Sequence, residues 1–120
     1  MAAVPEGTDV AAALTGSTIG SLSLALQGME DGAIASGLPR EIARPFVTQT
    51  LLTTARLLQE HPGSPADLKD QVASPGGTTI AGLAVLEERT VRGALMTTTR
   101  DAVNAKQTMG PAAPKEGREK

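Results

Sequence analysis

The sequence predicts a small all-α protein. Apolar residues recur at three- and four-residue spacing, as on one helical face, at Ile19, Leu22, Leu26, Met29 and Ala33. Helix start and stop signals punctuate the rest of the chain, and no stretch alternates apolar and polar residues as a half-buried strand would. A chain of 120 residues is long enough for one domain with a modest core. We assign that domain to residues 9–109.

The first helix is expected over about residues 10–35, after a flexible leader at residues 1–8. Gly16, Gly20, Gly28 and Gly32 each weaken this helix by up to about 1 kcal/mol relative to Ala. Two interpretations of their near-regular spacing stay open. The glycines form a face that another helix approaches closely, or the helix is broken between Gly16 and Gly20.

A second helix is expected over about residues 39–60, with Gly37 capping the helix before it and Pro39 starting the new one. Pro45 lies about two turns in and lacks the N–H that would bond back to Glu41. We therefore expect a kink at Pro45 or a helix start later than residue 39.

Three shorter helices complete the predicted fold. Ser64, Pro65 and Asp67 form a capping box with proline in the first turn, so a short helix should cover about residues 65–73. Helices over about 78–88 and 90–108 follow, the first with Thr78 as its N-cap. Residues 110–120 are charged and rich in Pro and Gly, and we expect a disordered tail.

Composition and charge exclude several functions. The net charge is −2 and Phe46 is the only aromatic residue, which argues against a nucleic-acid partner. Without cysteine and with only His61, a metal site or a Ser-His-Asp triad is not expected. We see no basic, apolar leader and no run near the roughly 20 apolar residues of a membrane span, so we expect a cytoplasmic protein without a membrane partner.

The most informative segment is the glycine-rich turn, residues 74–79, with the sequence Ser-Pro-Gly-Gly-Thr-Thr. Pro75 stiffens the backbone, while Gly76 and Gly77 allow positive φ and the close approach of a ligand. A glycine-rich turn that enters a helix presents free N–H groups and the positive end of the helix dipole. The turn is therefore either a candidate anion site or an ordinary loop before a helix cap.

The sequence around this turn resembles the pyrroline-5-carboxylate reductases. Three segments carry the resemblance: residues 37–43, residues 61–72 with Leu-Lys-Asp-Gln-Val at their end, and residues 74–87. The last is the most specific, and together they match the C-terminal half of that family. The resemblance implies an all-helical domain that interlocks with a second copy into a homodimer.

The resemblance also implies a reaction, the NADPH-dependent reduction of 1-pyrroline-5-carboxylate to proline in proline biosynthesis. It assigns the small carboxylate substrate to Ser74, Gly76, Gly77, Thr78, Thr79 and Gln71. It places the Thr79 hydroxyl near the imine nitrogen as the catalytic group. The family's NADPH-binding Rossmann domain has no counterpart here, since we find no Gly-x-Gly-x-x-Gly after a strand. We therefore expect no NADPH site in this chain, and no activity unless a cofactor domain is supplied in trans.

Two departures keep an alternative open. The family's Ser-Gly-Ser-Gly-Pro-Ala segment corresponds here to residues 15–20, Thr-Gly-Ser-Thr-Ile-Gly, and Pro45 is a second oddity. The alternative is a non-catalytic helical dimerisation module derived from the same family. Lys69 and Asp70 are adjacent and need not pair on a helix, and they form either a solvated face or a border of the site.

Overall fold

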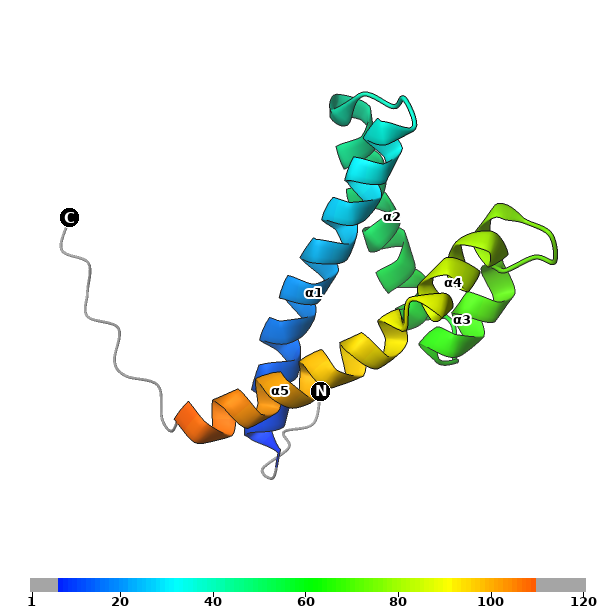
Figure 1. Ribbon diagram of the computed structural model, residues 1–120. Helices are drawn as coiled ribbons and strands as arrows, with labels where there is room; N and C mark the ends of the chain where they lie inside the picture. Colours follow the sequence, from blue (N-terminus) through cyan, green and yellow to red (C-terminus); the bar gives the residue numbers. More distant parts are fainter. Residues whose placement is uncertain (1–6, 110–120) are drawn as a thin grey trace, which may run out of the picture.

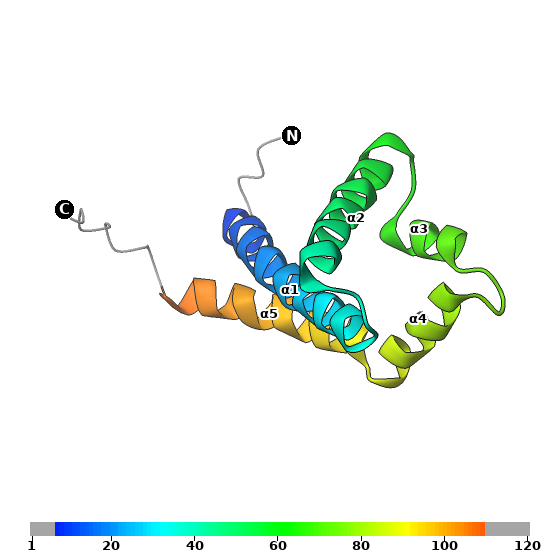
Figure 2. The ribbon, with the colours of Figure 1, turned by 90° about the horizontal axis from the view of Figure 1, so that it is seen from above.

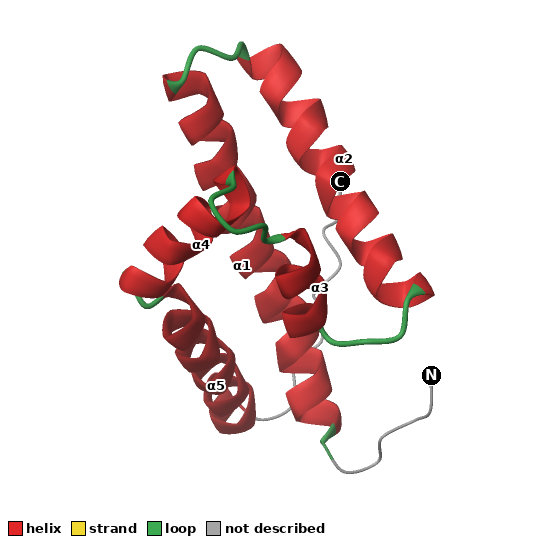
Figure 3. Ribbon diagram, turned by 90° about the vertical axis from the view of Figure 1, so that its right-hand side faces the viewer, coloured by secondary structure: helices red, strands yellow, loops and turns green. Residues whose placement is uncertain are grey.

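The structure, a computed structural model, describes residues 7–109 and confirms the all-α prediction (Figure 1). Its five helices are α1 (Thr8–Ala35), α2 (Arg40–Glu60), α3 (Pro65–Val72), α4 (Thr78–Glu88) and α5 (Val91–Met109), and no strand occurs among the described residues. Short loops join the helices (Figure 3). The predicted tail, and the predicted leader up to residue 6, lie outside the described residues.

Helix α1 is continuous through all four of its glycines, so the expected alternative of a break between Gly16 and Gly20 is wrong. A Cβ atom added at any of these glycines would meet nothing within 4 Å. No other helix of the same chain therefore approaches α1 closely at these positions. If the glycines serve a close helix contact, the second helix must come from outside this chain.

The loop between α1 and α2 follows the predicted stop-and-restart pattern. Gly37 has φ +108°, and a Schellman motif closes α1 through bonds from the Gly37 N–H to the Ile34 carbonyl and from the Leu38 N–H to the Ala33 carbonyl, both 3.0 Å long. Pro39 is the N-cap of α2, so that helix begins one residue later than 39 and stays helical through Pro45. Pro45 lacks the N–H that would bond to the Glu41 carbonyl and its ring crowds that carbonyl, so it weakens α2 locally without ending it.

The helices form an open arrangement in which α1 runs between α2 and α5 (Figure 2). Helix α3 packs on α2 and α4 packs on α5, while α3 and α4 scarcely contact each other. Ala43 in α2 is the only buried residue among those described. The single chain therefore has almost no core of its own, although its helices are apolar.

Many large apolar side chains are exposed in the single chain, including Leu24 (70%), Phe46 (65%), Ile19 (64%) and Met29 (58%). Helix α1 carries apolar residues around its whole circumference, a pattern typical of a helix buried on all sides. The fold thus requires apolar cover that a single chain does not provide.

Helix α1 is also long and apolar enough to cross a membrane by length and composition alone, with a window of mean hydropathy 1.3 that is 6% buried. The expectation that no segment would pass this test is wrong. The apolar character of α1 is hard to see in the sequence because Ala, Gly, Ser and Thr separate its large apolar side chains and interrupt any apolar run. The interior helix of an assembled soluble protein passes the same test.

Candidate functional site

The glycine-rich turn begins with a type II β-turn formed by Ser74, Pro75, Gly76 and Gly77. The Gly77 N–H donates to the Ser74 carbonyl at 3.0 Å. Pro75 takes the second position, where its fixed φ is suited, and Gly76 takes the third with φ +73°. The sequence expectation that Gly76 would adopt positive φ is confirmed, and its physical reason is the turn type.

Gly77 has a different role from the one expected, because its φ is −82° and therefore negative. A Cβ atom at Gly77 would lie 3.2 Å from the Ser74 carbonyl oxygen, so glycine is needed there for space. Gly77 is also the N-cap of α4, and Thr78 is the first helical residue. The prediction of Thr78 as the N-cap is wrong by one residue, because the β-turn places Gly77 in the extended conformation that precedes the helix.

The first turn of α4 has free backbone donors. The N–H groups of Thr78, Thr79 and Ile80 precede the first intrahelical bond, which the Ala81 N–H makes to the Gly77 carbonyl at 3.3 Å. No side chain caps this end of the helix. Free amides and the positive end of the helix dipole together favour an anion, and a carboxylate gains about 0.3–1 kcal/mol from the dipole alone.

The other predicted site residues lie at or near the same end of α4, with one exception. Ser74, Gly76, Thr78 and Thr79 are all exposed around the turn. Gln71 instead lines a small cavity of about 30 Å³ between the end of α2 and α3, together with His61 and Asp67. The structure therefore brings Ser74, Gly76, Gly77, Thr78 and Thr79 together and places Gln71 toward the α2–α3 junction.

Helix α3, which leads into the turn, begins with the predicted capping box. The Asp67 N–H donates to the Ser64 Oγ at 3.2 Å, and the Ser64 N–H donates to the Asp67 Oδ2 at 2.9 Å. These bonds from Ser64 hold the pKa of the Asp67 carboxyl below its ordinary value. The start of the short α3 helix is thus fixed locally by its own sequence.

Sequence reasoning missed two ion-pair clusters. Glu30 at the end of α1 accepts hydrogen bonds from Arg44 (3.0 Å) and Arg40 (2.9 Å) of α2. The Arg44 bond, followed by the Arg40 bond, lowers the pKa of the Glu30 carboxyl. Glu87 at the end of α4 is paired with Arg92 of α5. The available signal was an acid in the last turns of one helix followed by arginine early in the next.

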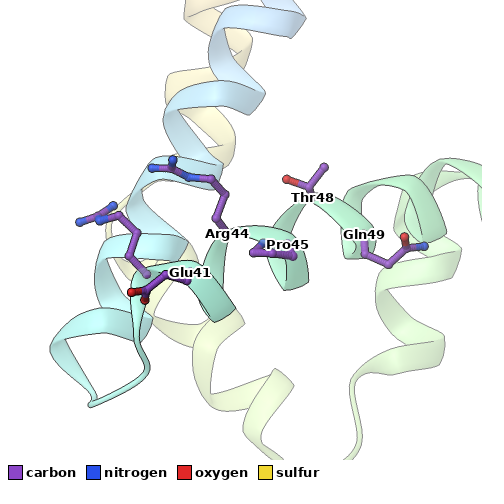
Figure 4. A pocket seen from close by; sticks show the side chains of 6 residues that line it. Glu41, Arg44, Pro45, Thr48 and Gln49 are labelled. Atoms are coloured by element: carbon purple, nitrogen blue, oxygen red, sulfur yellow. The ribbon is translucent and has the colours of Figure 1, made fainter.

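The first half of α2 borders a groove of about 580 Å³, lined by Arg40, Glu41, Arg44, Pro45, Thr48 and Gln49 (Figure 4). The guanidinium groups of Arg40 and Arg44 both bind Glu30, so the charge of this wall is balanced within the chain. No group of three or more His, Asp or Glu side chains that could hold a metal ion occurs among the described residues. The chemistry of the described site therefore rests on backbone amides and hydroxyl groups.

The fold and the turn define a class of protein: a small helical domain that needs apolar cover from a partner and presents uncapped backbone amides at a helix N-terminus. Comparison with known proteins identifies the family. Residues 5–109 match the family model described as pyrroline-5-carboxylate reductase dimerisation. The chain belongs to the pyrroline-5-carboxylate reductase family, through its dimerisation domain.

Individual relatives agree with this placement. A pyrroline-5-carboxylate reductase of Synechocystis is 43% identical over 108 residues, which cover 89% of this chain and 40% of the relative. The pyrroline-5-carboxylate reductase of Coxiella burnetii has a TM-score of 0.83 at 30% identity and is matched over 92% of this chain and 41% of its own. The Plasmodium falciparum enzyme, solved with NADP bound, has a TM-score of 0.82 at 27% identity, over 91% of this chain and 43% of its own. The chain thus spans about 40% of the length of these relatives.

Proposed function

We propose that this chain is the dimerisation and substrate-binding half of a pyrroline-5-carboxylate reductase, which reduces 1-pyrroline-5-carboxylate to proline with NADPH. The observation that carries the proposal is the glycine-rich turn, where the amides of Thr78, Thr79 and Ile80 are free to bind a carboxylate. Family membership supplies the reaction, and the geometry of the turn supplies a place for the substrate's negative charge.

Within this proposal the residues of the turn have separate roles. The backbone around Gly76 and Gly77 binds the substrate carboxylate together with the first amides of α4, and Ser74 and Thr78 border it. The Thr79 hydroxyl, in the first turn of α4, is placed next to the imine nitrogen of the bound ring. Gln71 contributes from the α2–α3 side. A threonine hydroxyl is a weak proton donor by itself, so we assign Thr79 to orientation and hydrogen bonding of the imine.

NADPH would be held by a Rossmann domain that is not among these 120 residues. The Plasmodium relative was solved with NADP bound, and it extends well beyond the region matched here. In the proposed enzyme that domain presents the hydride donor to the ring, while this chain holds the carboxylate. The cofactor domain then acts on the site formed by this chain.

The homodimer follows from the exposed apolar faces. A groove of about 520 Å³ between α1 and α5 is lined by small and apolar residues, among them Ser17, Gly20, Leu24, Ala94 and Leu95. A second copy that fills such grooves would cover the side chains left exposed in the single chain, at roughly 25 cal/mol for each Å² buried. Apolar cover from a second copy, in place of lipid, also accounts for the hydropathy of α1. We further propose a cytoplasmic location, which cell fractionation can test.

The direct test of the enzymatic role is complementation. The purified chain is mixed with the NADPH-binding domain of a related reductase and 1-pyrroline-5-carboxylate, and proline formation is measured with NADPH oxidation. We expect activity only when both parts are present. Thr79→Val should lower the rate by about 10- to 100-fold, and Thr78→Val serves as the matched control with a smaller effect. No proline with any cofactor domain tested would contradict the enzymatic proposal.

A second candidate function is a non-catalytic dimerisation module. The observation that favours it is the stretch of residues 15–20, which differs from the family's usual sequence and lies inside the continuous helix α1. The Thr15 hydroxyl there donates back to the Ala11 carbonyl at 2.9 Å and is directed to its own helix. A stable dimer that neither binds proline nor complements a cofactor domain would support this alternative.

A further inference from the structure

The glycine-rich turn lies between two helices that belong to different parts of the fold. Helix α3 packs on α2, and α4 packs on α5, but α3 and α4 scarcely touch each other. Figure 2 shows the turn joining the end of α3 to the start of α4. The position of α4's free amides relative to Ser74 therefore depends on whatever links these two parts.

Lys69 of α3 is placed to make that link. It lines a groove of about 260 Å³ formed by α2 and α3, where Thr54, Leu57 and Leu68 are its neighbours. It also lines a groove of about 450 Å³ formed mainly by α4 and α5. A lysine has an apolar stem and a charged end, so a single side chain can pack against one part and reach the other.

Charges on the α4–α5 side complement this lysine. Glu87 of α4 lines the same groove as Lys69 and accepts hydrogen bonds from Arg92 of α5, with 3.2 Å between Arg92 Nε and Glu87 Oε1. The Arg92 bond, and to a smaller degree the charge of Lys69, lower the pKa of the Glu87 carboxyl. The Lys69 ammonium also lies 3.9 Å from Asp70 Oδ1 on its own helix. Lys69 is thus paired with Asp70 on its own helix, and its charge faces Glu87 across the groove from beyond ion-pair distance.

We infer that Lys69 is a positioning residue for the glycine-rich turn: its stem packs on α2 and α3, and its charge attracts the Glu87–Arg92 pair across the groove at α4 and α5. The inference deepens the proposed function, since it takes this turn as the substrate site. This attraction fixes the position of the first amides of α4 relative to the β-turn of residues 74–77. Its loss lets α3 and α4 move relative to each other and loosens the turn without unfolding the chain.

The test is an NMR comparison of the whole 120-residue chain as the wild type, Lys69→Met, Glu87→Gln and a matched control, Glu88→Gln. Glu88 is exposed, neighbours Glu87 and forms no ion pair among the described residues. The first readout needs no ligand: hydrogen exchange of the Gly77 amide, which reports its bond to the Ser74 carbonyl. We expect exchange about two- to fivefold faster in Lys69→Met and Glu87→Gln, as suits a weak attraction between exposed charges. Glu88→Gln should match the wild type.

Three further measurements separate positioning from general stability. Lys69→Arg keeps charge and stem, so it should restore wild-type exchange at Gly77. High salt should reduce the difference between wild type and Lys69→Met, because exposed charges are screened. Proline affinity, measured from the Gly76 and Thr79 amides, should fall about two- to fivefold in Lys69→Met. Amides in α1 should keep their exchange rates in every variant.

The outcomes are distinct for this inference and for the proposed function. Gly77 exchange in Lys69→Met and Glu87→Gln equal to that in Glu88→Gln would overturn the positioning role, whether or not proline binds. Faster exchange spread evenly over all helices would also overturn it, because it would indicate a structural role only. Wild-type chain that binds no proline but shows the localised Gly77 effect would contradict the substrate assignment and leave the Lys69 link standing.

Discussion

Two pairs of consecutive helices in this chain are each joined by a loop that contains a glycine with positive φ, but the two connections differ in how well their backbone groups are paired. A loop with Gly37 at φ +108° joins α1 to α2, and a turn with Gly76 at φ +73° joins α3 to α4. In the first pair, Arg40 binds both Glu30 and Asp31 across the loop, and the two helices pack along each other. In the second pair the helices scarcely meet, and the helix after the turn has no side-chain cap.

Under the proposed function, this difference is the one between a structural connection and a binding one. In the α1–α2 loop the Schellman bonds satisfy the last carbonyls of α1, and three ion-pair contacts tie the helices together. In the α3–α4 turn the amides at the start of α4 are left without acceptors. A helix end with unmet donors is stable when water or a ligand satisfies them. The less complete connection is therefore the one suited to hold a substrate.

The largest expected effect concerns the apolar groove between α1 and α5. Leu24→Glu places a charge in the groove between α1 and α5, where a second copy is proposed to pack. Burial of an unpaired carboxylate should raise the dimer dissociation constant by at least about 100-fold. Sedimentation velocity measures the change, and Gln27→Glu, outside the lining of that groove, is the control. A Leu24→Glu dimer of wild-type affinity would show that this face is not the interface.

The next effect distinguishes the two glycine-containing connections directly. Gly77→Ala places a Cβ atom 3.2 Å from the Ser74 carbonyl oxygen, and we expect proline affinity to fall about tenfold as the turn is pushed open. Gly37→Ala is strained by its φ of +108° and should cost about 1–2 kcal/mol of stability with proline affinity unchanged. Titration calorimetry and thermal unfolding of both variants give the comparison. Equal effects on proline affinity would remove the distinction between the two loops.

A smaller effect is expected at the start of the second pair. Ser64→Ala removes the capping box of α3 and should cost about 1 kcal/mol of stability. Because α3 is anchored on α2 and the turn lies at its other end, proline affinity should change little. Denaturant unfolding measures the stability, and Ser36→Ala, at the C-cap of α1, provides a comparison at the first pair. An affinity loss as large as that of Gly77→Ala would mean that α3's start controls the turn.

The smallest expected effect concerns the ion pairs between α1 and α2, which should make the stability of the chain depend on pH. The pKa of Glu30 is lowered by Arg44 and Arg40, so the unfolded chain binds more protons than the folded one as the medium becomes acidic. The stability from this pair is complete above the ordinary glutamate pKa, near 4.3, and is lost as the pH falls through the lower folded value. Glu30→Gln should lower Tm by a few degrees at pH 7 and remove that acid dependence. Glu41→Gln, at a residue without an ion pair, should retain it.

The helices could be predicted from the sequence because the capping and stop signals at their ends act over only a few residues. The capping box at Ser64 and Asp67 and the restart at Gly37 and Pro39 act within a few residues, and both occur as predicted or within one residue of it. The glycines of α1 were ambiguous, because propensity alone cannot tell a broken helix from one supported by packing. Pro45 was ambiguous for the same reason.

The candidate site was predicted less completely. The β-turn shifted the N-cap from Thr78 to Gly77, because the cap depends on turn geometry beyond residue preference. Gln71 was assigned through the family resemblance, but the direction of a side chain on a short helix depends on packing against α2. The Glu87–Arg92 and Glu30–Arg44 pairs join different helices, and pairing across a loop depends on the angle between them. The angle between two helices cannot be predicted from local sequence patterns.

The central claim is that the glycine-rich turn binds a small carboxylate. We would test it by an NMR titration of the isolated chain with proline, following the amides of Gly76, Gly77, Thr78 and Thr79. The account predicts saturable chemical-shift changes confined to this turn, with the amides of α1 unchanged. The same titration of Gly77→Ala should give an affinity for proline about tenfold weaker. A well-folded dimer that shows no shift at these amides at millimolar proline would contradict it.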